Sequence, residues 1–191
     1  MTDREIIKFL EHAEKHEGKI NYMYICIAGK ITTGIGCVLH SVAEALRMEW
    51  RDLNGNLVDN KTIKKAYRLL SDMPAGKKHS YYIMHMPDEC KIFLSDGAVY
   101  KLAIDKIKNN YLPVLTHEFN GFEFYPSSVK IALLDIIYAV GAFSVRHGWP
   151  KLKVHCAAGR FDKASNEVKI SSQRPKFNKL RKQMMLDAAK C

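Results

Sequence analysis

Hydrophobic positions at the start of the chain follow a helical period. They recur every three or four residues: Ile6, Phe9, Leu10 and Ala13. This spacing predicts a first helix that runs to about residue 15 or 16. Thr2 with Glu5 three places later forms a capping box at its start, and Gly18 stands where a helix commonly ends. The chain is therefore expected to open with a helix that stops close to Glu17.

After Gly18 the pattern changes to that of a β-hairpin. Residues 20–27 are rich in β-branched and aromatic side chains, residues 28–30 read Ala-Gly-Lys, and residues 31–35 resume the strand pattern. Cys26 lies near the turn of this hairpin. Because strand side chains alternate between two faces, the isoleucines on either side of Cys26 should share one face and Cys26 should point to the other.

The middle of the chain alternates between helical and irregular stretches. Residues 41–50 and 61–70 have helical patterns, whereas residues 54–56 indicate a turn and residues 74–78 a surface loop. Residues 81–84, which read Tyr-Tyr-Ile-Met, fit a short strand and an extended linker equally well.

From residue 95 onward the pattern is mostly helical. The predicted helices cover residues 96–110, 126–143, 149–158, 161–165 and 176–189. The helix over 126–143 is apolar on almost all sides, which predicts the central helix of the core. Its apolar run is interrupted by Asp135 and falls short of the roughly 18 to 20 residues of a membrane span, so we expect no membrane span.

Positive charge is concentrated toward the end of the chain. The formal net charge is +10, and residues 146–191 contain twelve Lys and Arg against three acids. Such a segment either presents a positive surface to a polyanion or forms a solvated basic helix. We expect Lys179, Arg181 and Lys182 to provide attraction to a cell wall or another polyanion. Nothing in the segment matches a nucleic-acid-binding module, so no nucleic-acid partner is expected.

The cysteines and the first residues of the chain indicate the cellular compartment in which the chain is made. The five cysteines are odd in number and lack any CxxC spacing: Cys26, Cys37, Cys90, Cys156 and Cys191. This argues against a disulfide framework and against a zinc ribbon. The charged first residues contain no apolar run of signal-peptide length, so we expect a chain made in the cytoplasm without a secretory signal.

The helix end and the hairpin carry the candidate chemistry. At the C-terminal end of a helix the dipole disfavours the charge of Glu17, which suits a general acid, although a solvated helix-end acid is the plainer interpretation. Cys26 could hold a water, act as a thiolate base or nucleophile, or be a buried structural thiol. Thr32 could orient that water or be an ordinary strand residue. No Asp or Glu stands between Glu17 and Glu44.

Two other groups of polar residues carry weaker signals. His12 and His16 are four residues apart on the first helix and could share a metal, but no third ligand stands at a recognisable spacing. We therefore expect two surface histidines, no metal and no cofactor. Arg174 precedes the last predicted helix and is either a binding residue or a plain exposed arginine.

The spacing of the hairpin residues resembles that of a known family. Glu17-Gly18 is followed nine residues later by Cys26, and six residues further by Thr32-Thr33-Gly34-Ile35-Gly36. This resembles the phage-type lysozymes of glycoside hydrolase family 24 and the related pesticin-like muramidases, which have a Glu-Gly, a hairpin acid and a T-x-G-x-G at these spacings. Some phage relatives carry a cysteine in place of the hairpin acid.

The resemblance extends, more weakly, to the second half of the chain. Residues 129–142 (VKIALLDIIYAVGA) are similar to the family's central helix. Residues 149–152 (WPKL) and 158–164 (AGRFDKA) look like a further family segment. The chain departs from the pattern at Cys26, at Cys37, where a histidine is usual, and at Ala139, where an asparagine is usual.

The resemblance implies a fold and an activity. The expected fold is α+β and lysozyme-like, a single domain over residues 1–191. A hairpin lobe of about residues 17–37 would face a helical lobe of about residues 95–191 with the first helix, across a cleft. The implied enzyme is a muramidase that cleaves the β-1,4 bond between N-acetylmuramic acid and N-acetylglucosamine in peptidoglycan.

The resemblance also implies roles for single residues and partners. Glu17 would be the acid, Cys26 with Thr32 would position water, and Arg174 would pair with Glu17 or grip the glycan strand. An enzyme without a signal peptide would be released by lysis, as a phage endolysin is, or injected into a neighbour's periplasm as an antibacterial toxin. In the toxin case we expect an immunity protein that covers the cleft.

Three alternatives stay open. A lytic transglycosylase needs one glutamate only, which fits the missing second acid, and its products end in a 1,6-anhydro sugar. A catalytically inactive lysozyme-fold protein that binds the cell wall would also explain Cys26. A nucleic-acid binder would fit the basic end of the chain but leaves the hairpin motif without a role.

Overall fold

The computed structural model describes residues 1–171 and 173–190, and for His16 and Glu17 it describes the backbone alone. The chain forms two compact units: residues 1–11 with 105–191, and residues 12–104. The unit that carries the sheet is thus much larger than the hairpin lobe expected at about residues 17–37. The expected single lysozyme-like domain remains a prediction.

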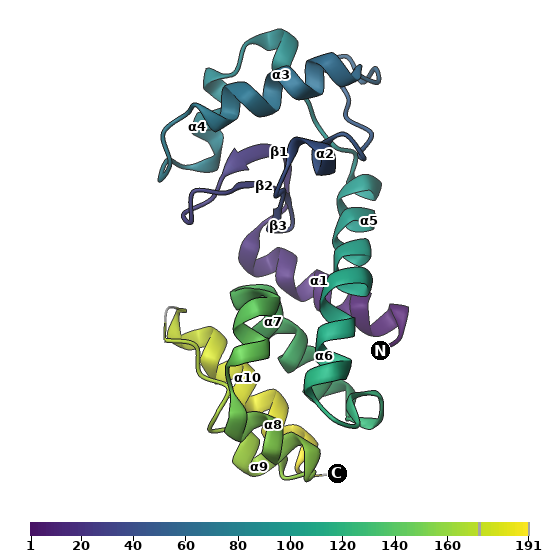
Figure 1. The fold of residues 1–191 in the computed structure, drawn as a ribbon, viewed down its shortest axis with the longest axis vertical. Coiled ribbons are helices and arrows are strands. Elements are labelled where there is room, and N and C mark those ends of the chain that lie inside the picture. Colours follow the sequence, from purple (N-terminus) through teal and green to yellow (C-terminus); the bar gives the residue numbers. More distant parts are fainter. Residues whose placement is uncertain (172, 191) are drawn as a thin grey trace. The chain divides into compact units, whose positions relative to one another are not determined.

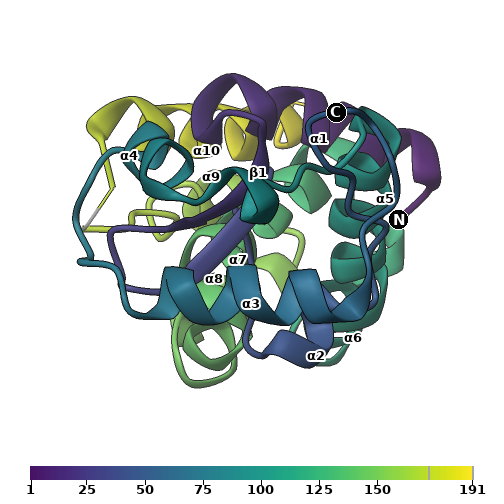
Figure 2. The ribbon, with the colours of Figure 1, turned by 90° about the horizontal axis from the view of Figure 1, so that it is seen from above.

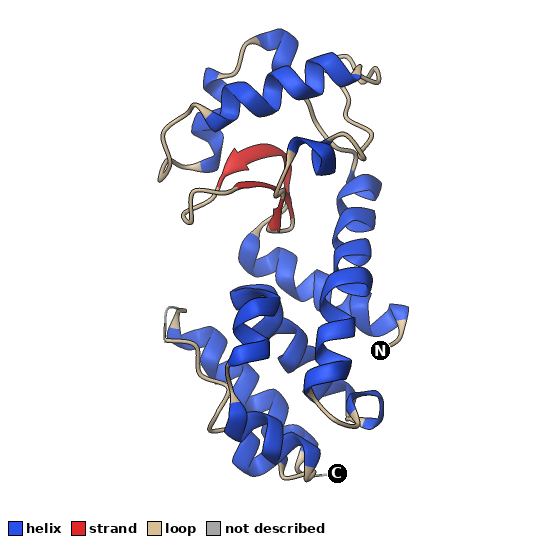
Figure 3. Cartoon of the chain, viewed as in Figure 1, coloured by secondary structure: helices blue, strands red, loops and turns tan. Residues whose placement is uncertain are grey.

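The fold is α+β, as expected, with helices far outnumbering strands (Figures 1 and 3). The first helix, α1 (Asp3–Glu17), begins in one unit and ends in the other. The remaining elements that begin in residues 12–104 are β1 (Ile20–Ile25), β2 (Ile31–Gly34), β3 (Cys37–Val38), α2 (Val42–Ala45), α3 (Asn60–Ser71), α4 (His79–His85), η1 (Asp88–Cys90) and α5 (Asp96–Lys106).

The second half of the chain is helical throughout the part that the structure describes. Its elements are η2, a π-helical turn (Ile107–Tyr111), α6 (Leu112–Glu118), η3 (Phe122–Phe124), α7 (Ser127–His147), α8 (Pro150–Ala157), α9 (Phe161–Ala164) and α10 (Pro175–Ala188). The helices predicted over residues 126–143, 149–158, 161–165 and 176–189 are confirmed, with boundaries that differ by a few residues. The helix predicted over residues 96–110 is present too, but it continues through η2 into α6, which was not predicted.

The first helix has the predicted start. The Thr2 amide donates to Glu5 Oε2 over 2.7 Å, and the Glu5 amide donates back to Thr2 Oγ1 over 3.3 Å. These reciprocal bonds satisfy two amides that the helix itself leaves without partners, so the capping box is confirmed.

The predicted hairpin is confirmed and is extended by a third strand. β1, β2 and β3 form an antiparallel sheet in that order. β3 escaped prediction because it has only two residues, too few for an alternating pattern. α3 and α4 pack against β1 in the same unit (Figure 2).

Residues 81–84 are helical, so the predicted strand or extended linker is wrong. They lie in α4, where the Tyr81 and His85 rings, four residues apart, stack at 3.9 Å. Tyr82 is fully buried, and its hydroxyl donates to the Pro74 carbonyl over 3.1 Å. Aromatic residues favour strands by intrinsic propensity, but here tertiary packing holds them in a helix.

The helix predicted over residues 41–50 is much shorter than expected. α2 covers only Val42–Ala45 and is capped by Ser41, whose hydroxyl accepts from the Glu44 amide. Trp50 is 1% exposed, and its indole N–H donates to the Ala45 carbonyl over 2.8 Å. Because this large ring is buried against the end of α2, the helix ends at Ala45.

α7 is the central core helix of its unit, as predicted. It packs against α6 and α10 and buries a nearly continuous apolar surface: Val129, Ile131, Ala132, Leu133, Leu134, Ile136, Ile137 and Val145. The helix bends at Gly141, whose φ of 81° and ψ of 164° are not helical. By length and composition α7 could cross a membrane, yet 44% of its apolar window is buried inside the protein.

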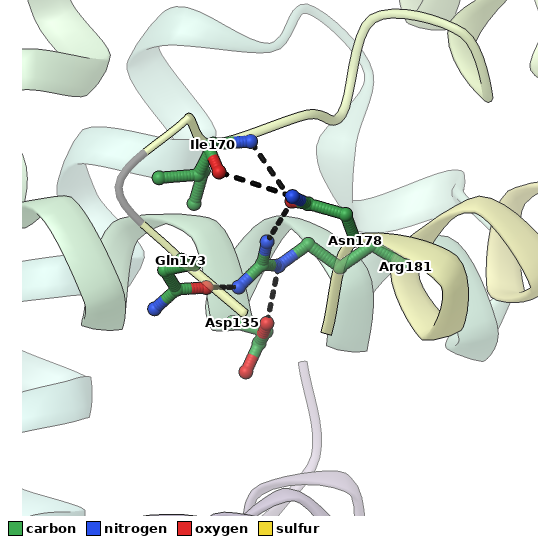
Figure 4. Close-up of polar contacts among 5 residues, drawn as sticks. All are labelled: Asp135, Ile170, Gln173, Asn178 and Arg181. Carbon is green, nitrogen blue, oxygen red and sulfur yellow. Dashed lines mark hydrogen bonds and ion pairs between the residues drawn. The ribbon is translucent and has the colours of Figure 1, made fainter. Parts of the chain in front are cut away.

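Arg181 is buried, so the expectation that it belongs to the basic surface is wrong. Its side chain is 1% exposed and lies in a network of polar contacts between α7, α10 and the segment before α10 (Figure 4). The guanidinium donates to Asp135 Oδ2, to Gln173 Oε1 and, over 2.9 Å, to Asn178 Oδ1. A buried charge needs such partners, because an unpaired one is very costly.

Candidate functional site

The end of α1 has the geometry that the Glu-Gly pair predicts. Glu17 is the last residue of the helix, and Gly18 follows with a φ of +77°, a left-handed conformation that suits glycine. The Gly18 amide donates to the Glu14 carbonyl over 3.0 Å. The Glu17 side chain, the predicted acid, lies outside the described part of the structure.

Two acids close to this helix end are engaged in structural contacts. The Tyr100 hydroxyl donates to Glu14 Oε2, and the Lys19 ammonium lies 3.8 Å from Glu14 Oε1. Lys19 also donates to Asp96 over 2.9 Å. These contacts fasten the segment after α1 to the start of α5.

Cys26 lies at the turn of the hairpin, directly after β1. Its amide donates to the Lys30 carbonyl over 2.9 Å, and its own carbonyl accepts from the Gly29 amide over 2.8 Å. Ile25 is 5% exposed and Ile27 is 99% exposed, so the expectation that they share a face is wrong. Strand geometry ends at Ile25, and alternation cannot be extended into the turn.

The Cys26 thiol is half-buried and is surrounded by hydrogen-bond donors. Burial opposes ionisation and is the largest single influence on its pKa. The Thr32 hydroxyl and the amides of Lys30 and Ala28 together outweigh that effect. The pKa of Cys26 is therefore lowered from its ordinary value, which favours the reactive thiolate.

Thr32 serves two acceptors with a single proton. Its side chain is 1% exposed, and its hydroxyl donates to the Lys30 carbonyl over 3.0 Å. A hydroxyl has only one proton, so donation to a Cys26 thiolate requires the bond to Lys30 to be released. With the thiol protonated, the same oxygen can instead accept from the S–H group. The Lys30 carbonyl and a Cys26 thiolate would therefore compete for the Thr32 proton.

The glycines of the Thr-Thr-Gly-Ile-Gly motif build the turn after β2. Gly34 and Gly36 have positive φ angles of 63° and 64°, and Thr33 pairs with Cys37 across the turn. A Cβ atom on Gly34 would lie 3.4 Å from Val99 Cγ1 of α5. The motif therefore fixes the turn and lets the sheet approach α5 closely.

Arg174 and the histidine pair of α1 are the remaining candidate residues. Arg174 belongs to the second unit, where it is exposed at the start of α10. The His16 side chain lies outside the described residues. Within the part of the chain that the structure describes, no group of three or more His, Cys, Asp or Glu could hold a metal ion.

An aromatic group beside the hairpin was not predicted. The Tyr22 hydroxyl and His79 Nδ1 lie 2.7 Å apart, and the Tyr24 and His79 rings are 6.3 Å apart. Alternation along β1 could have placed the two tyrosines on one face. His79 could not have been added, because α4 was not recognised in the sequence.

Comparisons with known proteins give no family for this chain: no family model matches it, and no match was found among curated proteins.

Proposed function

We propose that the protein is a peptidoglycan hydrolase, a muramidase that cleaves the β-1,4 bond between N-acetylmuramic acid and N-acetylglucosamine. The observation that carries the proposal is the contact of Cys26 with Thr32 in a hairpin that directly follows the Glu17-Gly18 helix end. The resemblance in spacing to the phage-type lysozymes and pesticin-like muramidases adds to it. A half-buried thiol of lowered pKa in that place is a group that can do chemistry.

Glu17 is the proposed general acid. Glycoside hydrolysis needs a carboxylic acid that protonates the leaving oxygen, and a second group that attacks the sugar or activates water. The negative end of the α1 dipole disfavours a charged Glu17 and so retains its proton. The backbone of α1 holds Glu17 at its last turn, three residues before β1 begins.

Cys26 is the proposed second group, and Thr32 is its positioning residue. The thiol is half-buried and can contact a water, whereas Thr32 is 1% exposed and acts through the sulfur. The Thr32 hydroxyl favours the thiolate of Cys26, the form that would hold or activate the water. Arg174 is a proposed substrate-binding residue from the resemblance alone.

A lytic transglycosylase is the second candidate. Three described carboxylates of the same unit are already bonded: Glu14 to Tyr100, Glu44 to the His40 amide, and Asp96 to Lys19. No acid among them is poised to share the chemistry with Glu17. In a transglycosylase the sugar's own hydroxyl replaces the water, and Cys26 would then serve packing or binding.

The products of a digest decide between these candidates. Purified peptidoglycan is incubated with the protein, and the released muropeptides are analysed by mass spectrometry. A muramidase gives reducing N-acetylmuramic acid ends, and a transglycosylase gives 1,6-anhydro ends that are lighter by one water. Release of nothing, with binding retained, would leave an inactive wall-binding protein and refute both enzymes.

The proposed setting follows from the substrate. The enzyme would act on the wall of a target cell or, at phage lysis, on the wall of the host, and it would need neither metal nor cofactor. If the protein is an injected toxin, an immunity protein in the producing cell should bind it and block wall lysis.

A further inference from the structure

The outer side of α9, α10 and the segment between them carries a cluster of cations, here called the basic face. Its members are all exposed: Lys163, Lys169, Arg174, Lys176, Lys179 and Lys182. None of them forms an ion pair among the residues that the structure describes. Their charges are therefore available to a ligand.

Two contacts hold the cations of α9 beside those of α10. In the first, Lys182 Nζ donates to Asn166 Oδ1 over 3.0 Å, and the Asn166 amide donates to the Lys163 carbonyl over 3.1 Å. This brings Lys182 next to the end of α9, where Lys163 lies.

The second contact is formed by the Asn178 side chain. It accepts from the Ile170 amide over 2.9 Å and donates to the Ile170 carbonyl over 3.0 Å (Figure 4). Lys169 and Lys179 are the chain neighbours of these two residues, so their backbones lie close together. The basic face is thus assembled from two segments and is not merely one charged helix.

The buried Arg181 network sets which side of α10 faces outward. Arg181 reaches inward to Asp135 of α7 and to Gln173, the residue before Arg174 (Figure 4). With Arg181 fixed inside, Lys179 and Lys182 are exposed. Along α10 these two lysines are separated by about 4.5 Å of helix rise, a short step between successive charges.

The basic face offers charge with no fully exposed aromatic ring among the described residues; the Lys176 ammonium lies 5.0 Å from the centroid of the half-buried Phe177 ring. Among described residues from 159 to 190, no large apolar side chain is exposed; Phe161 and Phe177 are half-buried. A surface that inserts into a membrane carries exposed apolar side chains, and one that binds single-stranded nucleic acid carries aromatic platforms. Asp162 and Glu167 are the acids between residues 159 and 174, and neither is buried.

We propose that the basic face binds a linear, base-free phosphodiester polymer of the poly(glycerol phosphate) type. A flexible single chain can bend its phosphates onto a compact cluster of cations. A DNA duplex instead holds its two rows of phosphates rigidly across grooves about 12 Å and 6 Å wide. The proposal does not depend on glycan hydrolysis, because the polymer contains no glycosidic bond in its backbone.

The test measures the affinity of the full chain for fluorescently labelled poly(glycerol phosphate) over a series of salt concentrations. One variant carries Lys163→Gln, Lys169→Gln and Lys179→Gln. The matched control carries Lys61→Gln, Lys64→Gln and Arg68→Gln, three exposed cations of α3 that make no ion pair among the described residues. Both variants lose the same net charge, and melting temperatures verify that both are folded.

The basic-face variant should bind at least about tenfold more weakly at low salt. Its slope of log K against log salt should fall by roughly two to three, about one for each lost phosphate contact, whereas the control should change the slope by less than about one. An equal loss in both variants would overturn the proposal, since only net charge would then matter. Tighter binding to duplex DNA with the same number of phosphates, or to anionic vesicles, would overturn it as well.

Discussion

The hairpin turn and the Arg181 network both place polar groups at partly or fully buried positions. The two regions differ in how these groups find hydrogen-bond partners. Arg181 donates from each of its three guanidinium nitrogens to a different acceptor, so these hydrogen bonds do not compete for one proton. Thr32 has one proton for two acceptors, the Lys30 carbonyl and Cys26. A network with fixed partners stabilises one conformation, whereas a group with competing partners can follow a change of protonation.

This difference assigns different consequences to the two regions. Changes around Cys26 should alter activity and thiol chemistry while costing little stability. Changes around Arg181 should cost stability first. Substitutions in each region test this division, beginning with the largest expected effect.

Glu17→Gln should abolish wall hydrolysis and leave the melting temperature nearly unchanged. The amide keeps the shape of the side chain but has no proton to donate, and loss of a general acid costs about 10² to 10⁴-fold in rate. Glu11→Gln on the exposed side of α1 is the control and should stay active. Turbidity loss of purified wall material measures the rates, and near-normal lysis by the Glu17→Gln variant would remove the acid from the mechanism.

Arg181→Ala should lower the free energy of unfolding by about 3 kcal/mol or more, because it leaves Asp135 and Gln173 without their buried partner. Lys179→Ala, two residues away and exposed, is the control. Replacing the pair together, with Asp135→Leu and Arg181→Met, should restore part of the loss, since no unpaired charge remains. Denaturant titration measures all of these, and a loss below about 1 kcal/mol for Arg181→Ala would contradict the network's structural role.

Thr32→Val should raise the pH at which Cys26 becomes reactive. The hydroxyl favours the thiolate, so the Cys26 pKa lies below the value of an ordinary thiol, and its removal moves the pKa upward. The lost hydrogen bond should cost about 1 kcal/mol of stability. The rate of alkylation by iodoacetamide against pH gives the midpoint. Thr33→Val, whose hydroxyl bonds the Ile20 carbonyl instead, should leave that midpoint in place.

The sign of this shift also fixes its effect on stability. A group whose pKa is lower in the folded chain than in the unfolded chain stabilises the fold fully only above the unfolded pKa. That contribution is lost as the pH falls through the folded value. Cys26 should therefore add stability only on the alkaline side, and Thr32→Val should reduce that gain.

Lys179→Gln should have the smallest effect on stability, within about 0.5 kcal/mol, because an exposed lysine without an ion-pair partner contributes little to the fold. Arg181→Gln, two residues further along the same helix, should cost several times more. Equal effects in chemical denaturation would mean that the burial of Arg181 has no energetic weight.

The sequence was informative where local patterns decide the structure. The capping box at Thr2, the glycine after Glu17 and the hairpin of residues 20–35 are all local, and all were found as predicted. The Thr2 and Glu5 side chains needed no distant partner. In such places propensity and spacing suffice.

The sequence failed where packing between separate elements and loops decides the structure. α4 became a helix because Tyr82 is buried against the loop at Pro74, and α2 ended early because Trp50 packs on it. Arg181 looked like one of several basic helix residues, since its partner Asp135 is 46 positions away. Likewise, the spacing of Cys26 and Thr32 suggested that the two residues act together. Only the structure shows that Thr32 is buried and that its hydroxyl also donates to the Lys30 carbonyl.

The central claim is that Cys26 stands where a glycosidase needs its second catalytic group. The most direct measurement is wall lysis and melting temperature for Cys26→Asp, Cys26→Ser and Cys26→Ala side by side. If the claim holds, Asp keeps activity because a carboxylate can hold or activate water, Ser falls between, and Ala loses most activity at an unchanged melting temperature. An active Ala variant together with an unfolded Asp variant would contradict it, because Cys26 would then only be packing.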